Sequence, residues 1–103
     1  MEEATLSQRV YAYLQTIPQG KVVTYGTIAT ALGNKGYARA VGNILHRNPD
    51  GERYPCYKVV NAAGKLSNRY AFGGIAQQKY RLEAEGIHVE NYRVDLRTYL
   101  YSE

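Results

Sequence analysis

The chain has 103 residues, 45% of them apolar and 21% charged, so we expect a single globular domain spanning residues 1–103. One cysteine excludes an internal disulfide, and two histidines with one cysteine cannot supply the usual four-ligand zinc site, so we expect neither metal nor cofactor. The net charge is a modest +4, and the lack of a secretory signal or an apolar run of about 20 residues excludes a membrane protein and favours a cytoplasmic one.

The first part of the chain predicts short helices joined by tight turns. Residues 5–17 form an apolar stripe at helical spacing, which a capping box between Thr5 and Gln8 opens. Thr24 can cap a second helix over residues 24–32. Because residues 33–36 form a glycine-containing connection to a further helix, we expect a helix-turn-helix.

The third helix, over about residues 37–47, has two different faces. One face is apolar and is expected to pack inward: Ala38, Val41 and Leu45. The other carries polar residues at every fourth position: Arg39, Asn43 and Arg47. The second face is therefore free to contact DNA.

The second half predicts a wing and one last helix. A turn at residues 48–51 precedes a hairpin that joins residues 54–60 to a short piece near Leu66. Residues 68–74 are expected to be loop and residues 75–85 helix, and the tail after Gly86 is ambiguous. The predicted fold class is mainly α with a small β hairpin, a winged helix-turn-helix DNA-binding domain.

The basic residues gather in the middle of the chain. Residues 21–69 hold eight Lys and Arg, including Arg69, against Asp50 and Glu52, which leaves this segment at +6. Such a segment is a candidate surface for a polyanion, although a solvated surface is the commoner origin of a charge excess.

Six short motifs occur together in one order. These are Val23-Thr24-Tyr25, Ala38-Arg39-Ala40-Val41-Gly42, Asn48-Pro49, Tyr54-Pro55-Cys56-Tyr57-Lys58-Val59-Val60, Gly73-Gly74 and Leu82-Glu83-Ala84-Glu85-Gly86. Their order and spacing resemble the DNA-binding domain of the O6-alkylguanine-DNA alkyltransferase family, close to its alkyltransferase-like subgroup. The resemblance covers residues 5–86.

The resemblance implies a direct displacement at Cys56. In the family a thiolate attacks the alkyl carbon on guanine O6, and a histidine after the cysteine, oriented by a glutamate, favours the thiolate. Cys56 and Glu85 occupy the cysteine and glutamate positions, while Tyr57 replaces the histidine. Because a neutral tyrosine is a poor base, a helix dipole, Lys58 or His46 are the open alternatives for activating the thiol.

The resemblance also assigns contacts to DNA and to the flipped base. Tyr25 and Tyr70 match pocket tyrosines, Arg39 matches the arginine that fills the vacated base stack, and the backbone of Cys56 and Val59 would read guanine. Further contacts to substrate or DNA are expected from three residues: Asn43, Asn48 and Lys58. Where the family often has serine near Tyr70, this chain has Ala71 or Phe72.

Three functions are weighed. The first is a monomeric repair protein that flips O6-alkylguanine out of double-stranded DNA and transfers the alkyl group once to Cys56, acting on the nucleoid or in the nucleus. The second is a lesion sensor without chemistry that recruits nucleotide excision repair proteins. An ordinary winged-helix regulator is third, and no preferred-sequence feature or dimer surface supports it.

Overall fold

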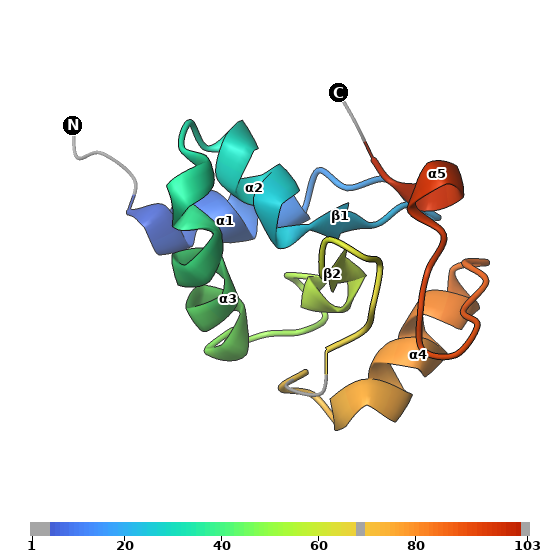
Figure 1. Ribbon diagram of the computed structural model, residues 1–103. Coiled ribbons are helices and arrows are strands. Elements are labelled where there is room, and N and C mark those ends of the chain that lie inside the picture. The colour runs from blue at the N-terminus through green and yellow to red at the C-terminus, as the bar shows by residue number, and fades with distance from the viewer. Residues whose placement is uncertain (1–4, 68–69, 102–103) are drawn as a thin grey trace.

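The computed structural model describes residues 5–67 and 70–101. Helices α1 (Leu6–Leu14), α2 (Tyr25–Ala31) and α3 (Ala38–His46) form one end of the molecule in Figure 1, and α4 (Gly74–Ala84) lies at the other. The short elements between and after them are β1 (Val23–Thr24), the 3-10 helices η1 (Lys35–Tyr37) and η2 (Cys56–Lys58), β2 (Val59–Val60) and α5 (Leu96–Tyr99). The predicted fold class is confirmed: a mostly helical chain with a small two-strand sheet.

Local capping sets where the first helices begin. Thr5 accepts a hydrogen bond from the Gln8 amide at 3.1 Å, and the Gln8 side chain accepts one from the Thr5 amide at 2.8 Å. Thr24 and Thr27 form the equivalent reciprocal pair at α2. Both caps satisfy amides that a helix leaves unpaired at its first turn, so both boundaries follow the sequence closely.

The sheet differs from the predicted hairpin. Val59 and Val60 pair in parallel with Val23 and Thr24, so the partner of β2 is β1 rather than the segment near Leu66. The turn that the sequence predicts at Ala63-Gly64 for this hairpin does form, because the Gly64 amide donates to the Asn61 carbonyl at 2.9 Å. The hairpin prediction was wrong in its pairing, since residues before Val59 form the 3-10 helix η2 instead of a strand.

The tail, ambiguous in the sequence, closes two parts of the fold. The Leu66 amide donates to the Tyr92 carbonyl at 3.0 Å, so the segment near Leu66 pairs with the tail and not with β2. Further along, Val22 donates to Tyr99 and accepts from Tyr101, each at 2.8 Å. The tail therefore binds the backbone just before β1.

The core extends from the three N-terminal helices through the sheet to α4. Its fully buried residues come from the helices and from the sheet, and they include Val10, Leu14, Ile28, Val41, Val59, Val60 and Leu82. The apolar stripes predicted for the first three helices point into this core, and the face of α3 that carries Arg39 and Asn43 remains exposed. The core thus fixes α3 beside the segment that holds Cys56.

Candidate functional site

A cavity of about 520 Å³ lies between α3, the Cys56 segment and the loop before α4. Six of the residues predicted for the site line it: Tyr25, Arg39, Asn43, Cys56, Val59 and Tyr70. Small residues, Ala38 and Gly42 of α3 among them, widen the wall on the helix side. The structure therefore brings together, from four separate segments, most of the side chains that the motifs singled out.

Asn48 and its neighbours set the position of Cys56. The Asn48 side chain donates to the Tyr54 carbonyl at 2.8 Å and accepts from the Asp50 amide at 2.9 Å, which folds the chain back toward the cavity. The Tyr54 ring stacks on Tyr11 with centroids 4.9 Å apart. Asn48 is buried, and its two hydrogen bonds hold the segment that leads to Cys56 in place.

The Cys56 thiol is largely shielded from water. Its side chain is only 6% exposed, and burial raises the pKa of the thiol, while a hydrogen bond from Asn48 and the charge of Arg81 act in the opposite direction. The net direction is upward, so the resting thiol is protonated at neutral pH. A nucleophilic role for Cys56 therefore requires a group that stabilises the thiolate.

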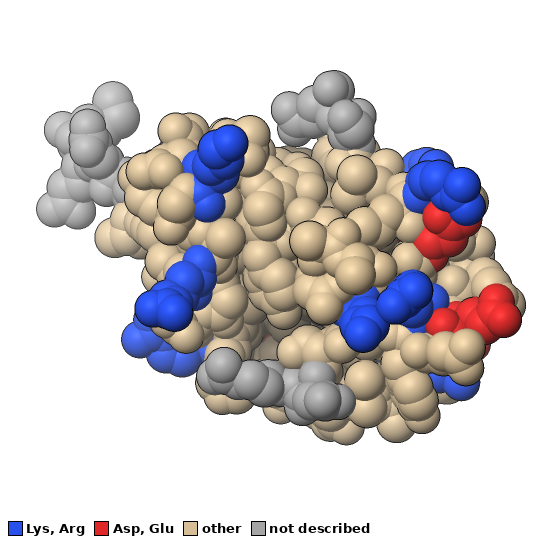
Figure 2. Space-filling view, in the orientation of Figure 1, with Lys and Arg blue, Asp and Glu red and all other residues tan. Residues whose placement is uncertain are grey.

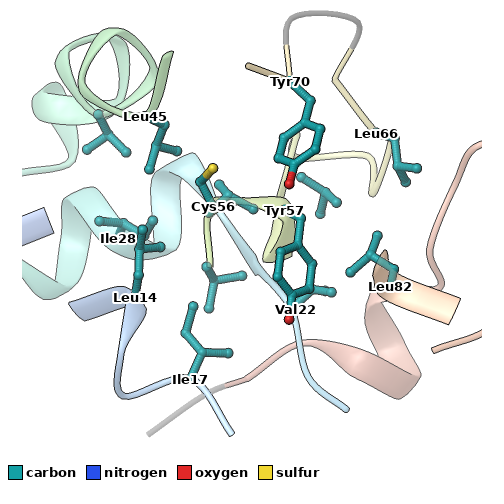
Figure 3. Close-up of a cluster of buried hydrophobic side chains, with 14 of the residues drawn as sticks. Leu14, Ile17, Val22, Ile28, Leu45, Cys56, Tyr57, Leu66, Tyr70 and Leu82 are labelled. Atoms are coloured by element: carbon teal, nitrogen blue, oxygen red, sulfur yellow. The ribbon is translucent and has the colours of Figure 1, made fainter. Parts of the chain in front are cut away.

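Tyr57 points away from the Cys56 sulfur (Figure 3). Its hydroxyl donates a hydrogen bond to Glu85 Oε2, and the Arg81 guanidinium lies 4.6 Å from the centre of its ring. Burial, together with the hydrogen bond to Glu85 and the charge of that carboxylate, raises the pKa of Tyr57 far above its ordinary value. Tyr57 is a hydrogen-bond donor to Glu85 and cannot serve as a base toward Cys56.

The buried Lys58 and the half-buried Glu85 form an ion pair on the far side of the cysteine loop. Lys58 Nζ lies 2.9 Å from Glu85 Oε1 and donates to the Pro18 carbonyl at 2.8 Å, and the Gly20 amide donates to the same carboxylate at 3.0 Å. Burial acts to raise the pKa of Glu85, but the hydrogen bonds from Tyr57 and Gly20 and the pair with Lys58 bring it below its ordinary value. Lys58 is 3% exposed and does not line the cavity, so the structure separates it from the predicted DNA and substrate contacts.

The exposed face of α3 borders the cavity with basic and polar groups. Arg39, Asn43 and His46 are exposed and line the cavity, and Arg47 is exposed at the end of the helix. On the face shown in Figure 2, Lys and Arg gather over the α1–α3 end with no Asp or Glu of residues 5–67 or 70–101 beside them, whereas both signs of charge occur at the other end. A polyanion bound to this face of α3 would therefore lie next to the cavity.

The loop before α4 supplies the opposite wall. Tyr70 is 8% exposed, and Phe72 contacts its ring edge-on with centroids 5.8 Å apart. The Phe72 ring packs against Gly51, where an added Cβ would lie 2.9 Å from it. Ala71 lines the cavity, so it is Ala71 rather than Phe72 that stands at this wall. Asn68 and Arg69, which the loop and charge predictions include, lie outside the described residues.

Gln78 is a site-supporting residue that the sequence reasoning missed. It is 1% exposed, and its amide nitrogen donates to the carbonyls of Tyr57 at 3.0 Å and Val59 at 3.1 Å, while its oxygen accepts from the Ser67 amide at 2.8 Å. A glutamine on the inward face of a helix is the feature that could have indicated it. Gln78 ties α4 to both the cysteine loop and the segment before Tyr70.

Within residues 5–67 and 70–101, no cluster of three or more His, Cys, Asp or Glu side chains has the arrangement of a metal site. No helix in the same residues is long and apolar enough to cross a membrane.

The fold and cavity together define a small helical domain with an exposed helix, basic at its borders, beside a buried thiol. Residues 5–87 match the family model described as 6-O-methylguanine DNA methyltransferase, DNA binding domain. The chain belongs to this family, as the motifs predicted.

Individual relatives extend over nearly the whole chain. A bifunctional methyltransferase/endonuclease of Picrophilus torridus is 42% identical over 99% of this chain, which spans 34% of that protein. A DNA base-flipping protein of Vibrio parahaemolyticus is 42% identical over 88% of this chain and 90% of its own length. Schizosaccharomyces pombe Atl1, solved with damaged DNA containing O6-carboxymethylguanine, superimposes with a TM-score of 0.86 at 34% identity, over 94% of each chain.

Proposed function

We propose that this protein binds duplex DNA, extrudes O6-alkylguanine into the cavity beside α3, and accepts the alkyl group on Cys56. The observation that carries the proposal is the position of the Cys56 side chain in the wall of a cavity of about 520 Å³ next to an exposed polar helix face. A relative named as a DNA base-flipping protein and a similar structure bound to an O6-alkylated guanine support the DNA-binding part of the proposal.

Recognition begins with the exposed face of α3. Arg39 stands at the cavity rim, where its planar cation can enter the duplex as the damaged base leaves. Extrusion costs a few kcal/mol of lost stacking, which a guanidinium in the gap offsets in part. Tyr25 lines the cavity on the side of α2, in position to contact the extruded nucleotide.

The chemical step is one displacement. The Cys56 sulfur attacks the alkyl carbon, the carbon–sulfur bond forms as the carbon–O6 bond breaks, and the electron pair of that bond goes to guanine. The thiol proton goes to solvent, and the base takes up one proton from solvent and leaves as ordinary guanine. A thioether is not readily cleaved, so each molecule acts once.

A second candidate function, a lesion sensor that holds the base and recruits nucleotide excision repair proteins, is favoured by one observation. The Tyr57 hydroxyl is directed to Glu85 and away from the sulfur, so the histidine position of the family supplies no base here. The two candidates share DNA binding and base extrusion and differ only in the fate of the alkyl group.

Intact-mass measurement after incubation with an O6-methylguanine duplex separates the two candidates. Transfer predicts a single methyl adduct that is absent in Cys56→Ser, whereas the sensor predicts tight, lesion-selective binding without an adduct. A wild-type protein that binds damaged and undamaged duplexes equally well would contradict both functions.

A further inference from the structure

Tyr70 carries a buried polar atom without a partner. Among the buried side-chain nitrogen and oxygen atoms of residues 5–67 and 70–101, its hydroxyl oxygen makes no hydrogen bond. Leaving a buried hydroxyl unpaired costs about 1–3 kcal/mol, so such a group in a cavity wall indicates a partner present only in a functional state. The side chain is 92% buried, since only 8% of it is exposed.

The hydroxyl lies on the Cys56 side of the Tyr70 ring. Both residues line the cavity, and Figure 3 shows the Tyr70 ring carrying its oxygen into the interior, to about the level of Cys56, while the Tyr57 ring carries its oxygen away from Cys56. Burial and then the negative charge of an ionised Cys56 raise the pKa of Tyr70 to about 12, so its proton remains available for donation at neutral pH.

Of the other polar groups near the sulfur, Asn48 hydrogen-bonds the thiol, and two further side chains are bound elsewhere. From α4, Arg81 is bound to Glu52 at 3.1 Å and covers the Tyr57 ring. From α1, the Tyr11 hydroxyl donates to the Ile44 carbonyl at 2.8 Å. The remaining titratable groups that share the cavity wall are Tyr25 on α2 and Arg39 and His46 on α3.

We infer that the Tyr70 hydroxyl acts beside Asn48 as a second donor that stabilises the Cys56 thiolate, an inference that rests on the proposed function. Tyr70 takes the place of the histidine-based activation that Tyr57 cannot provide. In this step Cys56 releases its S–H proton to solvent, Tyr70 keeps its own proton, and a small rotation turns the O–H toward the sulfur. Tyr70 is then a positioning residue, because it acts on the alkyl acceptor rather than on the base.

Tyr70→Phe removes the oxygen and keeps the ring that packs on Phe72. The test is the rate of Cys56 carboxamidomethylation by iodoacetamide against pH, followed by intact mass; the thiolate forms the carbon–sulfur bond and iodide leaves. A lost hydrogen bond to a charged group shifts the thiol pKa upward by about one unit, so the rate at pH 7 falls about tenfold while the rates at high pH converge. Tyr80→Phe, on an exposed ring of α4, is the matched control and keeps the wild-type profile.

The outcomes separate the inference from the proposed function. An unchanged pH profile in Tyr70→Phe overturns the inference, and if lesion-duplex affinity falls at the same time, the hydroxyl binds the base instead. An equal slowing at every pH indicates a structural role and also overturns it. A shifted profile in a protein that shows no preference for the lesion keeps the inference and removes the proposed function. If His46→Gln, measured in parallel, shows the shifted profile and Tyr70→Phe does not, the imidazole is the activating group and the inference is overturned.

Discussion

Replacing Gln78 by leucine is expected to loosen the whole site, because Gln78 lines the cavity and also ties α4 to the cysteine loop. Leucine fills a similar space but offers no hydrogen bond, so the carbonyls of Tyr57 and Val59 and the amide of Ser67 all lose their partner at once. At about 1–3 kcal/mol for each buried group left unpaired, the loss of unfolding free energy is at least about 3 kcal/mol. A domain of this size has only about 5–15 kcal/mol in total.

The measurement is thermal unfolding followed by circular dichroism, with urea unfolding as a second readout. A loss of about 3 kcal/mol lowers the melting temperature of a 100-residue domain by about 12–24 °C. Gln77→Leu, one position earlier on α4, is the control and should change stability by less than about 0.5 kcal/mol. If Gln78→Leu cost less than about 1 kcal/mol, the three hydrogen bonds would not be what holds the cysteine loop to α4.

Three further changes test other parts of the molecule. Arg39→Ala should weaken binding of an O6-methylguanine duplex at least tenfold in a fluorescence-anisotropy titration and leave the melting temperature unchanged, because the side chain is exposed; equal affinities would remove Arg39 from the proposed function. Because folding lowers the pKa of Glu85, its carboxylate stabilises the fold above the unfolded pKa of about 4.3, and this stabilisation is lost as the pH falls through the folded value. Glu85→Gln should therefore flatten the acid side of a curve of unfolding free energy against pH. Parallel curves for the two proteins would contradict the ion pair with Lys58. Gly64→Ala should destabilise the fold by about 1–3 kcal/mol in urea, since Gly64 has a φ of +84° and an added Cβ would meet the Val94 carbonyl oxygen; wild-type stability would show that the tail can shift there.

The helical part of the fold could be predicted because its causes are local. The Thr5 and Thr24 caps act within three residues, and the apolar stripe of α3 repeats at helical spacing within one segment. The sheet could not be predicted in the same way. Val59 and Val60 read as a strand, but nothing in two adjacent valines says whether the partner lies upstream at Val23 or downstream at Leu66.

The candidate site shows the same division. The motifs identified residues that meet at one cavity, because a family resemblance carries long-range information that propensities lack. The resemblance could not indicate where the Tyr57 hydroxyl and the Lys58 ammonium group point, since both depend on how Glu85 packs against the segment of residues 18–20. The unpaired hydroxyl of Tyr70 was likewise invisible in the sequence, as it is a property of what surrounds the side chain. The contacts of Tyr25, Arg39 and Asn43 with DNA stay predictions.

The Glu85 carboxylate changes how chains of this kind should be compared. It clasps three parts of the backbone together: the segment at Gly20, the cysteine loop through Lys58 and Tyr57, and the end of α4 on which it sits. A carboxylate with these structural contacts is needed for the fold whether or not a histidine follows the cysteine. Its presence in a related sequence is therefore weak evidence for chemistry, and the residue that follows the cysteine is the more informative position to inspect.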